Sequence, residues 1–218
     1  MLTLYGDPCS VFVRKPLLLL REKGVAFKLD PIDLYGYTHI EFEAASPLGK
    51  IPALRDDDFT LADSSAICAY IEKLYPYPAF YPHSAQDYAS ALWWEEYADT
   101  VLFKALAACY YQAILMPLYK NKAPDLTAIS HCLNVSLPPV ARYLEQHIAN
   151  KIYWVGNEFT IADVSIISMF FNMYHCGYAL NAAHYPHLDR YLQLHFKRPS
   201  LQQAQQEMAY KLQQLTVS

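Results

Sequence analysis

The segment Ile51-Pro-Ala-Leu-Arg-Asp-Asp-Asp-Phe-Thr-Leu61 contains two short apolar runs that are separated by three consecutive aspartates. Aspartates are common in tight turns, and short apolar runs with such boundaries are typical of strands. We therefore expect an antiparallel hairpin with strands at Ile51–Arg55 and Phe59–Leu61. Directly after the second strand, Asp63 suits the N-cap of a helix that runs to Tyr75.

The residues before the hairpin add a strand–helix–strand unit. Leu2–Tyr5 is a short apolar run, Ser10–Lys23 has a helical pattern, and Ala26–Leu29 is a second apolar run. Gly24 suits the end of the helix, and the strand–helix–strand order predicts a right-handed parallel crossover. A short helix is expected at His39–Ala45. The complete order, βαβ, then α, then ββα, is the thioredoxin-like arrangement.

The chain changes character near residue 76. Three prolines fall within Tyr75–Ser84. Because a proline lacks an N–H and restricts the residue before it, no helix is expected to cross this stretch. We therefore expect a thioredoxin-like domain at 1–76, a linker at 77–84 and an all-helical domain at 85–218.

Prolines also predict irregularities inside the second domain. A long helix is expected at Gln86–Leu115 and should be interrupted at Pro117. A second helix is expected at Asp125–Asn150 and should be broken or kinked at Pro138-Pro139, since a proline inside a helix removes a hydrogen bond and clashes with the preceding turn.

The segment Phe159-Thr-Ile-Ala-Asp-Val164 carries a strong signal for a helix start. Thr160 and Asp163 have the spacing of a capping box, in which each side chain satisfies a backbone N–H of the first turn. The apolar helix that follows, at Val164–Tyr174, is expected to form the centre of the helical domain. Two shorter helices are expected near Leu188–Phe196 and Leu201–Leu212.

Composition and charge exclude several classes of protein. The 218 residues are 54% hydrophobic and 17% charged, which is typical of a globular chain. The net charge of −4 gives no general basic surface for nucleic acid or an anionic membrane. No secretory signal is recognisable, and the longest oily segment, at 164–174, is too short to span a bilayer. Five cysteines and eight histidines without metal-ligand spacing predict reduced thiols, a cytoplasmic protein and no metal site.

Five motifs resemble those of the cytosolic glutathione transferases, in the same order and at the right spacing. Each motif alone is weak, but five in register cover most of the chain. The fold of that family, a thioredoxin-like domain followed by an all-helical one, agrees with the order of elements above. The resemblance implies a transferase that joins the sulfur of glutathione, its co-substrate, to a small hydrophobic electrophile. The matching segments are Leu4-Tyr-Gly-Asp-Pro-Cys-Ser10, Arg21-Glu-Lys-Gly24, Ser46-Pro-Leu-Gly-Lys-Ile-Pro-Ala-Leu54, Leu61-Ala-Asp-Ser-Ser-Ala-Ile67 and Phe159-Thr-Ile-Ala-Asp-Val164.

The resemblance implies that Ser10 activates the glutathione thiol, because Ser10 matches the position of the catalytic serine in the serine-type classes. A free thiol has a pKa of about 8.5, so only a few per cent is ionised at pH 7. A hydroxyl hydrogen bond and the positive end of a helix, both available at Ser10, are large enough to lower that pKa by about two units. Without such a function, Ser10 would simply cap the helix.

Cys9 is the alternative. The bacterial β-type class carries a Cys-Ser pair in the corresponding loop, and its cysteine contacts glutathione and forms mixed disulfides. On this interpretation the chain is a glutathione-dependent thiol–disulfide oxidoreductase. That class also uses a histidine in the long helix, where alignment places Phe103 here, which argues against its mechanism. Another alternative is a non-catalytic, transferase-like regulatory protein, which would tend to lose the glutathione contacts.

The same resemblance implies the residues that bind glutathione. Ile51-Pro52 matches the cis-proline step, which turns a backbone N–H and C=O toward the cysteinyl unit. Lys50 suits the glycyl carboxylate of glutathione. Alternatively, Lys50 is only a solvated charge on the surface. Asp63 and Ser64 match the pair that binds the γ-glutamyl carboxylate at a helix start, and Asp63 could instead act only as an N-cap. The basic residue that many relatives use in the 37–39 loop is left unassigned.

The electrophile pocket and the assembly are also implied by the family. Phe12, Phe103 and Tyr110 could line the pocket, although aromatic residues at helical spacing are more often core. Relatives form homodimers, and 15% aromatic residues fit an interface. The expected patches are the helix starting at Asp63 and the long helix near Trp93-Trp94. No nucleic acid or membrane partner is expected.

Overall fold

A computed structural model describes residues 1–33 and 39–217 of the chain. The chain folds into two compact units, Met1–Tyr81 and Pro82–Ser218. Part of the segment predicted as a linker, 77–84, belongs to the first unit: the N–H groups of Phe80 and Tyr81 donate to Glu72 Oε1 at 3.0 and 3.3 Å, and both residues are buried. The positions 37 and 38 considered for the glycyl end of glutathione lie outside the described residues.

The first unit is built on a sheet with the strand order β2-β1-β3-β4. The β1 and β2 strands are parallel, whereas β3 is antiparallel to both β1 and β4. This arrangement confirms the expected parallel pairing and the expected hairpin. The strands are β1 (Thr3–Tyr5), β2 (Lys28–Asp30), β3 (Ala53–Asp56) and β4 (Phe59–Ala62).

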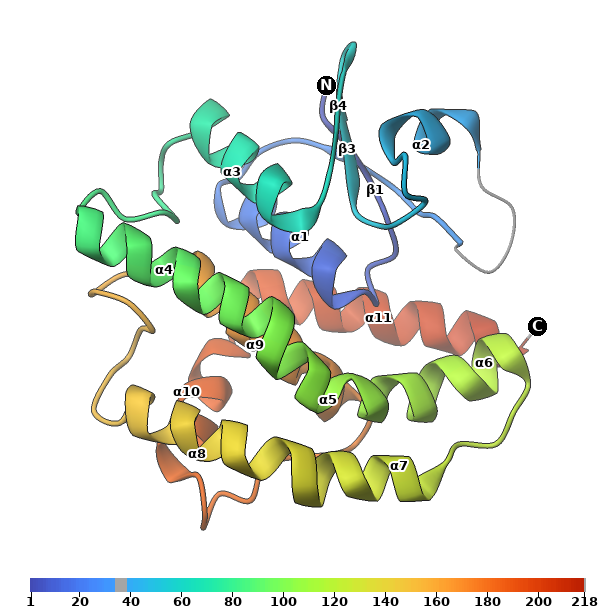
Figure 1. Ribbon diagram of the computed structural model, residues 1–218. Coiled ribbons are helices and arrows are strands. Elements are labelled where there is room, and N and C mark those ends of the chain that lie inside the picture. The colour runs from blue at the N-terminus through green and yellow to red at the C-terminus, as the bar shows by residue number, and fades with distance from the viewer. Residues whose placement is uncertain (34–38, 218) are drawn as a thin grey trace. The chain divides into compact units, whose positions relative to one another are not determined.

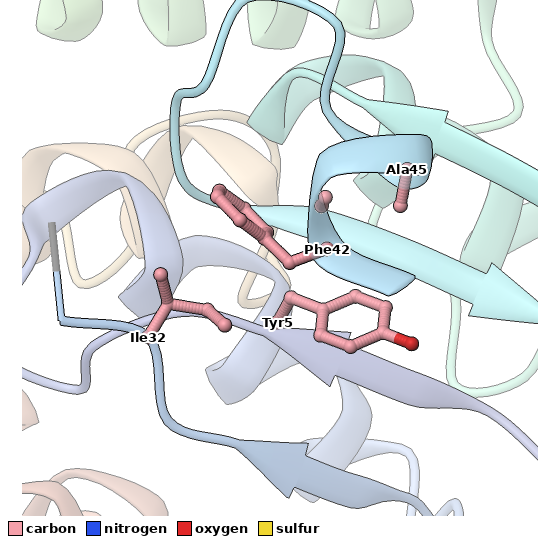
Figure 2. Close-up of a cluster of buried hydrophobic side chains, with 5 residues drawn as sticks. Tyr5, Ile32, Phe42 and Ala45 are labelled. Atoms are coloured by element: carbon pink, nitrogen blue, oxygen red, sulfur yellow. The ribbon is translucent and has the colours of Figure 1, made fainter. Parts of the chain in front are cut away.

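Three helices complete the first unit (Figure 1). The α1 helix (Val11–Glu22) packs against α3 (Ser64–Leu74), and the short α2 helix (Ile40–Ala45) packs against the hairpin strands. Figure 2 shows a cluster of buried apolar side chains from β1, α2 and the chain after β2. The cluster fixes one face of the sheet and contains Tyr5, Ile32, Phe42, Ala45 and Ala53, with Ile51 packed against it.

The second unit begins with one continuous helical path, Ala85–Lys120. Its π-helical turn η2 ends two residues before Pro117. The predicted interruption at this proline is wrong, because the path continues to Lys120 and ends at the left-handed residue Asn121. A π turn closes a wider ring than an α turn, and we attribute the tolerance of the proline ring to this widening. The segments are α4 (Ala85–Tyr97), η1 (Ala98–Leu102), α5 (Phe103–Tyr110), η2 (Tyr111–Leu115) and α6 (Met116–Lys120).

The next helical path shows the same feature. A π turn, η3 (Cys132–Ser136), lies between α7 (Leu126–His131) and α8 (Leu137–Ile148) and ends two residues before Pro138. The residues before Pro138 and Pro139 are already helical, so we attribute the tolerance of these prolines to the wider π turn, as at Pro117. Of the expected break or kink at Pro138-Pro139, the break is absent, because the helical path continues through both prolines, and the irregularity is the π turn just before them.

The α9 helix (Ile161–His175) forms the core of the second unit, and nearly all of its residues are buried. It packs against α4, α5 and α10 (Pro186–His195), and the chain ends with α11 (Pro199–Val217). The predicted capping box is confirmed, with Asp163 Oδ2 accepting from the Thr160 N–H at 2.9 Å. The other oxygen, Oδ1, accepts from the Trp154 N–H at 2.9 Å and the Tyr191 hydroxyl at 2.8 Å.

The path Ala85–Lys120 is also unusually apolar. It contains an 18-residue window with a mean hydropathy of 1.5, of which only 22% is buried within the molecule. By length and composition alone, this helix could cross a membrane, which the sequence analysis did not anticipate. Leu92, Trp93 and Val101 are exposed on this path, and neighbouring exposed apolar residues are typical of an interaction surface.

Candidate active site

The strand register brings the predicted site segments to one edge of the sheet. Tyr5, Ala53 and Ala62 lie side by side on β1, β3 and β4. Because β3 runs antiparallel to its two neighbours, its first residue meets their last residues. The loop from Asp7 to Ser10 follows β1, Pro52 directly precedes β3, and Asp63 directly follows β4.

The loop after β1 has little freedom. A Cβ atom added to Gly6 would lie 2.5 Å from Val13 Cγ2, so α1 approaches the strand end more closely than any side chain permits. The carboxylate of Asp7 accepts from the Cys9 N–H at 2.8 Å, and the Asp7 carbonyl accepts from the Ser10 N–H at 2.9 Å. Ser10 is therefore presented in one orientation at the start of α1.

Ser10 occupies the N-cap position with extended backbone angles, but its side chain makes no capping hydrogen bond. The simple capping role considered for this residue is therefore absent, and the half-buried hydroxyl is not committed to the helix. Cys9 beside it is only 3% exposed. The side chain of Ser10 is thus the more accessible of the two candidate groups.

The Ile51-Pro52 peptide bond is cis, as expected. The residue before it is fixed by Ser46, whose hydroxyl accepts from the Lys50 N–H at 3.0 Å and donates to the Lys50 carbonyl at 2.6 Å. The Lys50 side chain is exposed. The backbone at the start of β3 is therefore held while the ammonium group stays available.

Asp63 takes an uncommon left-handed conformation, with φ at 81°. Its Oδ1 accepts from the N–H groups of Ser65 and Ala66 at 2.9 and 3.1 Å, so Asp63 caps α3. Ser64 is 5% exposed and forms the first residue of the helix. A non-glycine residue at positive φ stores strain that the surrounding structure must hold, and such residues cluster at functional sites.

Comparison with known proteins identifies the family. Models described as the glutathione S-transferase N-terminal and C-terminal domains match residues 4–79 and 110–207. Glutathione S-transferase F13 of Arabidopsis thaliana is 32% identical over 166 residues, which cover 74% of this chain and 75% of that protein. The chain belongs to the glutathione S-transferase family. Glutathione S-transferase 3 of Zea mays is similar, at 34% identity over 75% of this chain and 74% of its own length.

Solved structures of this family have the same fold. Glutathione transferase F7 from Populus trichocarpa superimposes with a TM-score of 0.83 at 28% identity, and the match covers 95% of this chain and 99% of that one. These findings confirm the predicted fold class, a thioredoxin-like domain followed by an all-helical domain, and place the chain among the glutathione transferase enzymes.

Two buried cations of this transferase were not predicted from the sequence. Arg14 and Lys15 on α1 are both 0% exposed. Arg14 Nη2 donates to the carbonyls of Pro8 and Cys9 at 3.2 and 3.4 Å, and Lys15 Nζ donates to Ser65 Oγ at 3.0 Å. The available signal was their place inside the otherwise apolar run 11–20, since lysine and arginine are almost never buried without partners.

The three aromatic residues proposed for the electrophile pocket are divided between the units. Phe12 is half-buried on α1 in the first unit. Phe103 and Tyr110 are half-buried at the first and last positions of α5 in the second unit. Among residues 1–33 and 39–217, no three His, Cys, Asp or Glu residues come together as metal ligands.

Proposed function

We propose that this transferase binds glutathione at the sheet edge formed by the ends of β1 and β4 and the start of β3, and that Ser10 activates its thiol. The observation that carries the proposal is the register, because it brings Ser10, the cis-proline step and the start of α3 to one edge from three separate segments. The uncommitted Ser10 hydroxyl supports the assignment.

Each part of glutathione has a matching group at this edge. The backbone N–H and C=O next to the cis bond at Ile51-Pro52 suit a strand-like pairing with the cysteinyl unit. The exposed ammonium of Lys50 suits the glycyl carboxylate. The N–H groups at the start of α3, with Ser64, suit the γ-glutamyl carboxylate, because a helix N-terminus attracts anions.

The chemistry that follows is nucleophilic substitution or addition. The Ser10 hydroxyl donates a hydrogen bond to the glutathione sulfur and stabilises the thiolate, and the partial positive charge at the start of α1 acts in the same direction. The thiol proton passes to solvent, and the thiolate attacks an electrophilic carbon. In substitution, the electron pair of the broken bond leaves with the displaced group; in addition, the electron pair of the attacked π bond moves to the neighbouring atom, which takes up a proton. Phe12, two residues after Ser10 on α1, is proposed to bind the apolar part of the electrophile.

Replacing Ser10 and Cys9 separately tests the assignment. Ser10→Ala should lower the rate of glutathione conjugation to an aryl halide by about ten- to a thousandfold, the range for loss of one stabilising hydrogen bond. Cys9→Ser should leave the rate largely unchanged, because the Cys9 side chain is buried and, on this proposal, the Ser10 hydroxyl alone contacts the glutathione sulfur. The rate is followed by the absorbance of the conjugate.

The reverse ranking would overturn the serine assignment. If Cys9→Ser abolishes conjugation, or if the protein reduces disulfides with glutathione and loses that activity in Cys9→Ser, the thiol–disulfide oxidoreductase is the correct function. Retention of both activities in both variants would show that neither side chain contacts the sulfur.

We further propose that the protein is a cytoplasmic homodimer. Five cysteines without a disulfide suit a reducing compartment. The exposed apolar residues of the path Ala85–Lys120 provide a surface for a second copy, among them Leu92, Trp93 and Val101. Trp94, which was expected in the same patch, is only 4% exposed and belongs to the core.

A further inference from the structure

The guanidinium of Arg14 lies behind the loop that presents Ser10. Its Nη2 donates to two successive carbonyls, those of Pro8 and Cys9, and the side chain is fully buried. Long helical side chains point toward the helix N-terminus, and Arg14 lies one turn after Ser10, so it reaches back to the loop from inside α1. These two hydrogen bonds both hold the loop before Ser10.

These contacts fix both sides of the peptide unit that joins Cys9 to Ser10. The carbonyl of this unit accepts from Arg14, while its N–H donates to the Asp7 carbonyl at 2.9 Å. A peptide unit held at both polar atoms cannot rotate, and its plane sets the direction in which the Ser10 Cα–Cβ bond points. A hydrogen bond to a charged donor is also stronger than a neutral one.

We propose that Arg14 is a positioning residue, which holds the loop so that the Ser10 hydroxyl faces the glutathione sulfur. The inference rests on the proposed function, because it requires that Ser10 activates the thiol. Arg14 is fully buried and acts through Ser10, so glutathione affinity should depend little on it.

Arg14→Lys and Arg14→Met test this role. A lysine keeps the charge but replaces the planar fork by a single ammonium, so it cannot hold the carbonyls in the same way. We expect the pKa of enzyme-bound glutathione, titrated by thiolate absorbance in the ultraviolet, to rise by about one unit in Arg14→Lys and by more in Arg14→Met. One unit corresponds to about tenfold less thiolate below the pKa. The KM for glutathione should change little.

Lys23→Met is the matched control. Lys23 ends the same helix, has a side chain that is 0% exposed, and donates to the carbonyls of Tyr75 and Pro78 at 2.7 and 2.6 Å. It lies nine residues from Arg14, about 14 Å along the helix. Its loss should lower stability without changing the pKa of the bound thiol.

A double mutant separates positioning from a general structural role. If Arg14 acts through Ser10, Arg14→Lys in a Ser10→Ala background should add almost nothing to the rise in the pKa of the bound thiol. Full additivity would overturn the inference. It would also be overturned if the Arg14 variants behave like Lys23→Met, with lower stability and an unchanged thiol pKa, or if only the KM for glutathione rises.

The failure of the proposed function has a different signature. In that case Ser10→Ala itself leaves the pKa of the bound thiol at the wild-type value. If Ser10→Ala raises this pKa while the Arg14 variants do not, the serine assignment stands and only the role of Arg14 is wrong. Should Arg14→Met fail to fold, Arg14→Lys decides between these outcomes.

Discussion

At the scale of single residues, the burial of the cysteine thiols argues against Cys9 as the reactive group of the active-site loop. Cys9, Cys68, Cys109 and Cys132 are at most 3% exposed, and the last two lie in contact, with Sγ atoms 3.2 Å apart. Cys176 is partly exposed, but burial raises its pKa to about 12. None of the five thiols therefore combines access with an ordinary thiolate fraction.

We predict that the native protein reacts slowly with an aromatic disulfide reagent near neutral pH, and that Cys176 reacts first. Because the pKa of Cys176 is raised, the reaction should accelerate as the pH increases toward 12. Denaturation should expose five fast thiols. The release of the reagent's thiol is measured by absorbance, and Cys176→Ser should remove the slow native reaction. A fast native phase that disappears in Cys9→Ser would instead support the oxidoreductase.

Among the elements, the start of α9 depends on one buried carboxyl group. Asp163 is 0% exposed, and burial raises its pKa to about 6 despite the hydrogen bonds from Thr160, Tyr191 and Trp154, which act in the opposite direction. The folded state therefore binds a proton at this site more tightly than the unfolded chain, whose ordinary pKa is 3.8. Stability from this group is full below the unfolded pKa and is lost as the pH rises through about 6.

Comparison of the wild type with Asp163→Asn should reveal this dependence. Asparagine does not titrate, so the difference in free energy of unfolding isolates the carboxyl group. We expect the wild type to lose about 2 kcal/mol relative to the variant between about pH 4.5 and about pH 7, since one pKa unit is about 1.4 kcal/mol. Urea unfolding at several pH values measures it. If the wild type instead gains stability relative to Asp163→Asn as the pH rises, the hydrogen bonds outweigh burial in setting the pKa of Asp163.

The outline of these elements was predictable, whereas their irregularities were not. The strands could be predicted because Gly, Pro or Asp residues flank short apolar runs. The start of α9 could be predicted because Thr160 and Asp163 have capping-box spacing. The π turns before Pro117 and Pro138 were missed, since proline marks where a regular helix fails but not how the preceding turn adapts.

The candidate site was predictable as a set of segments but not as a set of contacts. Motif order located Ser10, Pro52 and Asp63. Their meeting at one edge depends on the register of β1, β3 and β4, which pairs residues far apart in the chain. The roles of Arg14 and Ser46 depend on hydrogen bonds to backbone carbonyl or amide groups, and such bonds leave no residue pattern.

At the scale of the whole molecule, the apolar path Ala85–Lys120 leads us to predict that two copies of the chain associate. Light scattering at micromolar concentration should give a mass near twice 25.0 kDa. Trp93→Arg should shift the mass toward a single chain, because Trp93 is 48% exposed on α4 and a charge there opposes burial in an interface.

Val135→Arg provides the control for the dimer test, because Val135 is 57% exposed outside this path, on η3. It should leave the mass unchanged. A single-chain mass for the wild type would contradict the homodimer. Binding of that single-chain form to neutral lipid vesicles would assign the apolar path to a membrane instead.

The close approach at Gly6 also limits how this sequence can evolve. Every single-base change of a glycine codon that alters the amino acid introduces a Cβ atom, and that atom would meet Val13 at 2.5 Å. Gly24 is different: its φ of 65° disfavours most side chains, but nothing lies within 4 Å of a Cβ there, so asparagine or aspartate remains open to drift at modest cost. Lineages descending from this gene should therefore diverge at codon 24 while codon 6 stays glycine, unless a smaller residue replaces Val13 first.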